Sequence, residues 1–160
     1  MEEKKMFEPE ALNSVAQFHR IFQLPVLDQP VIPSKERIEL RISLLEEELK
    51  ELQAAIDADD LVEVADAFCD LQYVLSGAIL EFGLGYQFKE LFDEVQRSNM
   101  SKPCKTLEEA EATQSYYEKE RGMESVIKKV GDEYLVYRKS DGKVFKSVQY
   151  SPPDLEKILK

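Results

Sequence analysis

Two pairs of acidic residues are the part of this chain best suited to chemistry. Glu48 and Glu51 lie in the stretch LLEEELKEL, and Glu63 and Asp66 lie in DLVEVADAFCDL. Residues three apart project from one side of a helix, so each pair presents two carboxylates together. The second stretch is otherwise apolar, a setting in which anions repel one another unless cations lie among them. The pattern therefore predicts a site for a hard divalent cation such as Mg²⁺, which prefers oxygen ligands and often binds substrate phosphates.

Helical-wheel positions indicate which acids face inward. Glu48 and Glu51 lie on the shoulder of an apolar stripe, whereas Glu46 and Glu47 point further out and are expected to face solvent. The next helix carries one continuous stripe at steps of three and four, made of Glu63, Asp66, Asp70, Tyr73 and Gly77. Two antiparallel helices joined by a tight turn would bring the two acidic sets opposite each other.

Two simpler roles compete with a metal site. Glu63 could be the N3 residue of a capping box in which Asp60 is the N-cap. The run 46–48 could be an ordinary solvated face of a helix. Neither role explains Asp66 and Asp70, which lie in the middle of a helical stretch. We therefore interpret the two pairs together as a metal site.

Apolar periodicity and capping residues predict the elements that position these acids. Ser34 is the expected N-cap of the helix that carries Glu48, and Gly83 and Gly85 are expected to end the helix after it. The proline-rich stretch LPVLDQPVIP is expected to be an extended connection. We predict helices over residues 9–23, 34–56, 61–82, 87–97 and 107–121.

The last part of the chain changes character. From Ser125 on, VIKKV, EYLVYR and KVFKSV are rich in β-branched and aromatic residues, and Ser140–Gly142 predicts a hairpin turn between the last two. A final helical turn is expected in DLEKILK. The prediction is a mainly α fold, an antiparallel helical bundle with a small C-terminal β-hairpin. Residues 1–122 would be the all-α catalytic bundle, and residues 123–160 a hairpin extension of the same domain.

Composition narrows the class of protein. A chain of 160 residues and 18.5 kDa suits one domain, and a net charge of −11 argues against a nucleic-acid polymer as partner. No stretch approaches the roughly 20 apolar residues of a membrane span. The beginning, MEEKKMFEPE, lacks the apolar core of a signal peptide, and Cys69 and Cys104 are too few for a disulfide framework. We expect a cytoplasmic protein.

The chain also resembles a known family. EELKEL, followed by EVADAFCDLQYVLSG, is similar to the paired E-x-x-E and E-x-x-D helices of MazG-like, all-α nucleoside triphosphate pyrophosphohydrolases. Their superfamily includes phosphoribosyl-ATP pyrophosphohydrolase and the dimeric dUTPases. The spacer of 11 residues between the pairs (52–62) is short for the superfamily but suits a tight helical hairpin. VAQFHRIFQLP, FDEVQRSNMSK and GKVFKSVQYSPPDL also resemble segments of a MazG-like branch.

The resemblance implies an activity and roles for the acids. Members cleave a nucleoside triphosphate into a monophosphate and pyrophosphate with Mg²⁺, for which Mn²⁺ is able to substitute. The implied metal ligands, which are also catalytic residues, are Glu48, Glu51, Glu63 and Asp66. Asp70, one turn beyond Asp66, would be a further catalytic carboxylate, as a ligand or as a neighbour of the ligands.

Three residues are candidates for binding the nucleotide. By resemblance, Lys102 would stabilise the charge that develops on the leaving pyrophosphate. Asn99 would hydrogen-bond the sugar or base, or else cap its own helix. Tyr73, on the acidic stripe, would border the base or else belong to the core. Arg97 and Lys89 are weaker candidates.

Other classes of protein fit this sequence less well. A carboxylate-bridged di-iron bundle needs a Glu-x-x-His on each of two helices, and the single histidine, His19, lies outside any such motif. His19 is expected to pack between helices or at an interface. A non-catalytic interaction module would leave the acidic stripe unexplained. Within the enzymes, phosphoribosyl-ATP pyrophosphatase of histidine biosynthesis is the alternative.

A homodimer or a dimer of dimers is the expected assembly. The helix that carries Glu48 has a second apolar face, made of Ile38, Ile42, Leu45, Leu49 and Ile56, which needs cover. Helical bundles are commonly completed by two-fold pairing, and relatives in the superfamily assemble from two chains. In the alternative monomer, the later helices would fold back over this face.

Overall fold

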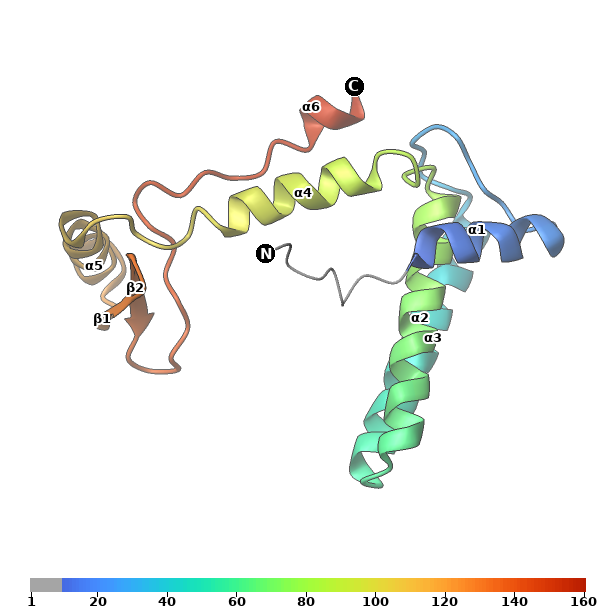
Figure 1. Ribbon diagram of the computed structural model, residues 1–160, viewed down its shortest axis with the longest axis horizontal. Helices are drawn as coiled ribbons and strands as arrows, with labels where there is room; N and C mark the ends of the chain where they lie inside the picture. Colours follow the sequence, from blue (N-terminus) through green and yellow to red (C-terminus); the bar gives the residue numbers. More distant parts are fainter. Residues whose placement is uncertain (1–9) are drawn as a thin grey trace, which may run out of the picture. The chain divides into compact units, whose positions relative to one another are not determined.

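Residues 10–160 are described by a computed structural model and form six helices and one two-stranded antiparallel sheet (Figure 1). The mainly α fold with a small hairpin towards the C-terminus is thus confirmed. The expected start of the first helix at Pro9 lies outside the described residues. The chain divides into two compact units, one ending at Phe88 and one spanning Lys89–Lys160. The boundary between the two units lies well before Ser125, where the composition of the chain changes.

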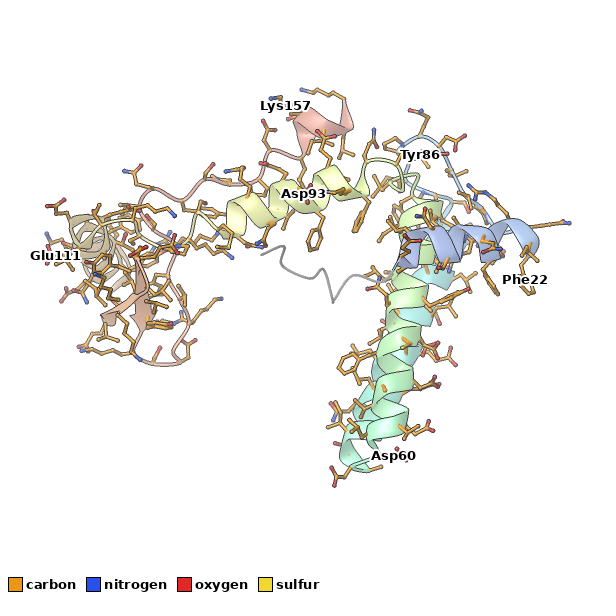
Figure 2. The ribbon with its side chains drawn as sticks, viewed as in Figure 1. Phe22, Asp60, Tyr86, Asp93, Glu111 and Lys157 are labelled. Atoms are coloured by element: carbon orange, nitrogen blue, oxygen red, sulfur yellow. The ribbon has the colours of Figure 1, made fainter. Side chains whose placement is uncertain are left out.

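The first unit is built on an antiparallel helical hairpin. Its helices are α2 (Lys35–Asp57) and α3 (Leu61–Glu81), which lie side by side in Figure 1, and α1 (Ala11–Ile21) packs against α3. Ser34 caps α2 by accepting the Arg37 backbone N–H, as the sequence predicts. Asp60 caps α3 in the same way, and it marks the turn at the end of the hairpin in Figure 2. Both caps satisfy backbone donors that a helix start leaves unpaired.

A buried charged network joins the three helices at the other end of the hairpin. The carboxylate of Glu81 accepts hydrogen bonds from Arg37, whose Nε lies at 3.1 Å, and from Arg41. Arg41 Nη2 also donates to His19 Nε2 at 3.3 Å, and His19 Nδ1 donates to the Pro25 carbonyl at 2.8 Å. A carbonyl only accepts, so the proton of the imidazole lies on Nδ1. His19 therefore has the packing role that its sequence suggests.

The charge of Glu81 is held in place by these partners. Only 1% of Glu81 is exposed, and burial by itself raises its pKa. The hydrogen bonds and positive charges of Arg37 and Arg41 outweigh burial and keep this pKa below its ordinary value of 4.5. Gly77 leaves the space that the network occupies, since a Cβ there would lie 2.8 Å from His19 Nε2. The network therefore fixes how α1 and α2 pack on α3.

The second unit combines helices with the sheet. It contains α4 (Phe88–Asn99), which begins at the boundary, α5 (Leu107–Arg121), β1 (Ser125–Val130), β2 (Glu133–Arg138) and the short α6 (Glu156–Leu159). Helix α5 packs on both strands. The buried core between them consists of Cys104, Ala110, Val136 and Phe145, and the Tyr117 ring stacks on Phe145 at 3.8 Å.

The predicted hairpin is wrong in its choice of strands. The sheet pairs β1 with β2 over six residue pairs, with the turn at Gly131 and Asp132. Ser140–Gly142 does turn the chain back, but the returning segment makes only the Tyr137–Val144 bridge. It leaves the sheet because its next residues bind α5 instead: the Val148 N–H donates to Thr113 Oγ1 at 3.0 Å.

The network at Glu81 generates a stability prediction. In Glu81→Gln the buried Arg41 loses its counter-charge, so we expect the free energy of unfolding to fall by about 3–5 kcal/mol. Urea unfolding measures this loss. Glu39→Gln, at an exposed residue of α2, is the control and should cost less than about 0.5 kcal/mol.

The same network predicts a pH dependence. Because the native pKa of Glu81 lies below its ordinary 4.5, its contribution is complete above pH 4.5 and is lost as the pH falls through the native pKa. The difference in unfolding free energy between wild type and Glu81→Gln should therefore shrink on acidification. A difference that stayed constant between neutral and strongly acidic pH would contradict this assignment.

Candidate metal centre

The α2–α3 hairpin brings the predicted acids together, and we call the five of them the acidic row: Glu48, Glu51, Glu63, Asp66 and Asp70. The positive pKa shift of Glu48 includes repulsion from Glu51 on its own helix and from Asp70 and Asp66 on α3. Glu51, Glu63 and Asp66 line one groove. The antiparallel pairing of the helices thus places both pairs on neighbouring surfaces, as the sequence predicts.

Glu48 is the most constrained member of the acidic row. It is half-buried, and its Oε2 is a buried atom with no hydrogen-bond partner in the described part of the chain. Burial raises the pKa of Glu48, and the charges of Glu51, Asp70, Glu47 and Asp66 raise it further. A buried oxygen without a donor, surrounded by like charges, is an environment that a cation would stabilise.

The groove beside Glu51 has room for a ligand. Its volume is about 470 Å³, and three alanines, Ala54, Ala55 and Ala58, line it on the α2 side. Opposite them are Glu63 and Asp66, with Asp60 at the end and Ala67 beside them. Short alanine side chains leave the carboxylates as the chemically active part of the wall. Asp60 is a groove residue that sequence reasoning missed, because its D-x-x-E spacing was interpreted only as helix capping.

The acidic row is not neutralised by the described part of the chain. Across residues 10–160, none of its five carboxylates accepts a hydrogen bond or forms an ion pair within 4.0 Å. In that same range no three acidic, histidine or cysteine side chains lie close enough together to hold a metal ion as they stand. Carboxylate oxygens fit a hard cation such as Mg²⁺, so binding it would require these side chains to turn toward a common point.

The structure decides between the competing roles of Glu63. Asp60 does act as the N-cap, since its carboxylate accepts the N–H groups of Val62 and Glu63. A capping box would also need Glu63 to accept the Asp60 backbone N–H, but that N–H donates to the Ala55 carbonyl at 3.1 Å. The carboxylate of Glu63 therefore plays no part in capping. Glu46 and Glu47 are both exposed, as expected.

Tyr73 lies at the edge of an apolar groove. Its ring contacts Phe18 of α1 edge-on, with centroids 5.5 Å apart, and 40% of the residue remains exposed. The groove beside it has a volume of about 360 Å³ and is lined on α3 by Phe68, Cys69 and Gln72. Tyr73 thus has a structural contact to α1 and an open side toward an apolar space.

The candidates of the second unit are linked to each other. Lys102 Nζ donates to Asn99 Oδ1 at 2.7 Å, so the structure brings these two residues together. Arg97 is engaged by Glu94, with Nε 2.7 Å from Oε2, and also donates to Ser151 and Pro152. Lys89 pairs with Asp93. Asn99 and Lys102 therefore form a pair of their own in the second unit, and the acidic row belongs to the first.

Comparison with known proteins identifies the class. The sequence pattern of the phosphoribosyl-ATP pyrophosphohydrolase family matches residues 15–99, more than half of the chain and all of the acidic row. The chain belongs to this family, which confirms the resemblance drawn from the paired acidic helices. It is therefore a member of a pyrophosphohydrolase family, whose enzymes hydrolyse phosphoanhydrides.

One relative among the curated proteins is viral. An uncharacterized protein of Acanthamoeba polyphaga mimivirus is 37% identical over 81 residues, which make up 48% of this chain and 32% of the viral one. The chain thus spans about a third of the length of that relative.

Within residues 10–160, no helix combines the length and apolar composition needed to cross a membrane.

The uncompensated charge at Glu48 predicts that removing this charge stabilises the metal-free protein. In a chelator, Glu48→Gln should raise the free energy of unfolding by roughly 0.5 kcal/mol or more, because it removes like-charge repulsion at a buried oxygen. Adding Mg²⁺ should then stabilise the wild type more than this variant. Thermal unfolding with and without Mg²⁺ measures both effects.

The matched control is Glu46→Gln on the same helix. Glu46 is exposed, so its substitution should leave both measurements close to the wild type. Two results would argue against a metal site at Glu48: a loss of stability of Glu48→Gln in the chelator, or equal stabilisation of all three proteins by Mg²⁺.

Proposed function

We propose that the protein is a Mg²⁺-dependent nucleotide pyrophosphohydrolase that cleaves a nucleoside triphosphate to a monophosphate and pyrophosphate. The observation that carries the proposal is the acidic row, five carboxylates on paired helices that form no ion pair with any side chain of residues 10–160. Membership of a pyrophosphohydrolase family supports the type of reaction. A triphosphate that arrives with divalent cations would supply the missing positive charge.

The reaction assigns roles to the acidic row. Glu48, Glu51, Glu63 and Asp66 would hold Mg²⁺, which when bound supplies charge for the phosphate oxygens and acidifies a water molecule. The carboxylates of the row would orient a water molecule toward the α-phosphorus and would accept one of its protons. The water oxygen would form the new bond to the α-phosphorus, and the bond to the bridging oxygen would break, so that pyrophosphate leaves with that oxygen. Asp70 extends the row by one turn and would hold or orient the same groups.

Residues outside the acidic row would bind the rest of the nucleotide. Tyr73 lies on the same helix as Asp66 and Asp70, and its exposed edge borders an apolar groove that suits a nucleobase. The linked pair of Asn99 and Lys102 offers an amide and a cation for the sugar and for the leaving pyrophosphate. These roles follow from the family resemblance together with the chemistry of the side chains.

A second candidate substrate is phosphoribosyl-ATP. The family that matches residues 15–99 carries the name of the enzyme that hydrolyses this compound. The same acidic row would serve, since the bond that breaks is again a phosphoanhydride. A substrate test must therefore include phosphoribosyl-ATP beside the common nucleotides.

We also propose that two chains pair through the apolar face of the hairpin. Along α2, exposed apolar residues recur at steps of seven, at Ile42, Leu49 and Ile56, each more than half exposed. On α3 an apolar series follows at steps of three and four, made of Leu61, Val64, Phe68, Leu71 and Leu75. Side chains at this spacing form the seam of paired helices. A four-helix bundle formed from two hairpins would bury this apolar surface.

A substrate panel tests the activity. The full chain is incubated with Mg²⁺ and each nucleoside triphosphate or phosphoribosyl-ATP, and the products are separated. We expect pyrophosphate and the matching monophosphate, with no hydrolysis when a chelator is in excess. Release of single orthophosphate, full activity in chelator, or no hydrolysis of any compound would contradict the proposal, and the last result would favour a non-catalytic interaction module.

Single substitutions test the assigned roles. Glu48→Gln, Glu51→Gln, Glu63→Gln and Asp66→Asn should each lower the turnover at least about a hundredfold, the scale of losing a preorganised charge. Glu46→Gln is the matched control, because it removes the same charge from a solvent-facing position of α2. A loss in Glu46→Gln as large as that in Glu48→Gln would contradict the assignment of ligands.

Light scattering tests the pairing of chains. At micromolar concentration we expect a mass of at least twice 18.5 kDa, the mass of one chain. Leu49→Glu, which places a charge on the apolar face, should shift the mass toward one chain, whereas Ser43→Glu at an exposed polar position should not. A fully active protein with the mass of one chain would refute the dimer.

A further inference from the structure

The second unit contains a concentration of positive charge, of which the proposed hydrolysis uses only Lys102. Residues 121–150 hold seven lysines and arginines against four acidic residues, in a chain whose net charge is −11. Composition alone therefore hides a basic segment. This segment forms the end of α5, the sheet and the chain that returns from it.

Several of these cations line one pocket. Its volume is about 540 Å³, and no acidic residue lines it. The positive side chains come from four different stretches of the chain and are Lys102, Arg121, Arg138, Lys143 and Lys146. We call this the basic pocket. Cations gathered from separate stretches differ from a charged stripe along one helix, because only the fold brings them together.

Aromatic side chains give the basic pocket a firm wall. The stacked rings of Tyr117 and Phe145 line it, and Phe145 belongs to the buried core of the unit. Tyr116 packs edge-on against Tyr117 and remains 43% exposed. Packing against the core therefore holds the rings of Tyr117 and Phe145 in place, and the cationic side chains line the pocket around them.

Most of the cations have no carboxylate partner. Arg138 pairs with Asp141, but Lys102 is bonded only to the Asn99 amide oxygen, and Lys146 lies over the Tyr150 ring at 4.4 Å. Arg121 and Lys143 form no ion pair with any side chain within residues 10–160. Positive charges held near one another repel, so an anion among them would be stabilised.

A neighbouring tyrosine responds to this charge. The hydrogen bond that Ser98 donates to the Tyr150 hydroxyl lowers the pKa of Tyr150, and the charges of Lys146 and Lys102 lower it further. The direction agrees with a positive potential on this side of the unit.

We propose that the basic pocket binds a phosphoanhydride-linked anion, either free pyrophosphate or the polyphosphate tail of a nucleotide, without needing a divalent metal. Two or more linked phosphates carry several charges on a short span, which suits cations spread around one pocket. Lysine and arginine are the usual protein partners of phosphate oxygens. Tyr116 offers a ring face to the base when the ligand is a nucleotide. The proposal does not depend on hydrolysis by the acidic row.

Calorimetric titration of the full chain in excess chelator tests this. Without metal, the acidic row cannot recruit phosphates, so any binding reports cations outside the row. We expect pyrophosphate and ATP to bind and AMP to bind at least about tenfold more weakly, because it offers one phosphate. ATP that binds more tightly than pyrophosphate identifies the nucleotide as the ligand, whereas equal affinities identify the phosphates alone.

Two double variants locate the binding. Arg121→Gln with Lys143→Gln should weaken pyrophosphate binding at least about tenfold, the scale of losing a charged hydrogen bond. Lys128→Gln with Lys129→Gln removes two cations of β1 that do not line the pocket, and should change the affinity less than about twofold. Unfolding curves of both variants report whether the fold is intact.

Three outcomes would contradict a phosphoanhydride site in the basic pocket. Absence of pyrophosphate binding to the intact wild type in chelator, or equal weakening in both double variants, would overturn the proposal. Displacement of pyrophosphate by single-stranded RNA at lower concentration would also overturn it, in favour of a nucleic-acid surface. Glu51→Gln should still bind pyrophosphate in chelator, so a failure of the proposed hydrolysis is distinguishable from a failure of this site.

Discussion

The proposed function of the first unit depends on negative charge, carried by the paired helices α2 and α3, that no side chain of residues 10–160 neutralises. Like charges on adjacent helices cost free energy at every contact, and the cost grows as water is excluded. Glu48 illustrates this, since it sits between α2 and α3 with a buried oxygen that has no donor and with carboxylates on both helices around it. A cation would stabilise such an arrangement.

The other end of the same hairpin shows how the protein treats a buried acid whose role is structural. Glu81 is as deeply buried as any carboxylate of the described residues, yet Arg37 and Arg41 satisfy it and His19 continues the network to α1. One hairpin therefore contains a neutralised acid that fixes the packing and a row of acids that have no hydrogen-bond or ion-pair partner among residues 10–160. This contrast, rather than the number of acids, is the strongest argument for a metal site.

The two units differ in charge, since the sequence up to residue 88 holds 18 acidic against seven basic residues, whereas residues 89–160 hold 14 of each. The acidic row of the first unit would attract divalent cations under the proposed function, and the second unit contributes the basic pocket, whose cations come from the loop before α5, from α5, from β2 and from the chain that returns from the sheet. Both surfaces suit the same chemical group, a phosphoanhydride, one through metal and one directly. A protein that handles pyrophosphate or triphosphates would benefit from both kinds of contact.

Local signals allowed much of the fold to be predicted, and contacts distant in sequence explain what was missed. Ser34 and Asp60 cap helices as their side chains suggest, and helical spacing agrees with Glu63 and Asp66 lining one groove and with Asp66 and Asp70 lying near Glu48. The hairpin was placed one strand too late, because Val148 binds Thr113 of α5, which strand propensity does not reveal. Arg41 and Glu81 are 40 residues apart, so no local pattern links them. The basic pocket was missed because its cations come together only in the folded chain.

The central claim, that the acidic row binds divalent metal, is tested most directly by paramagnetic broadening of backbone NMR signals with Mn²⁺ in place of Mg²⁺. The claim predicts that substoichiometric Mn²⁺ first broadens the amide signals of Glu48–Glu51 and Glu63–Asp70, and that excess Mg²⁺ restores them. Glu36 and Glu39, exposed acids on the same helix, serve as the internal reference and should broaden later. The claim would be contradicted if the signals of Glu36 and Glu39 broadened at the same Mn²⁺ concentration as those of the acidic row, or at a lower one.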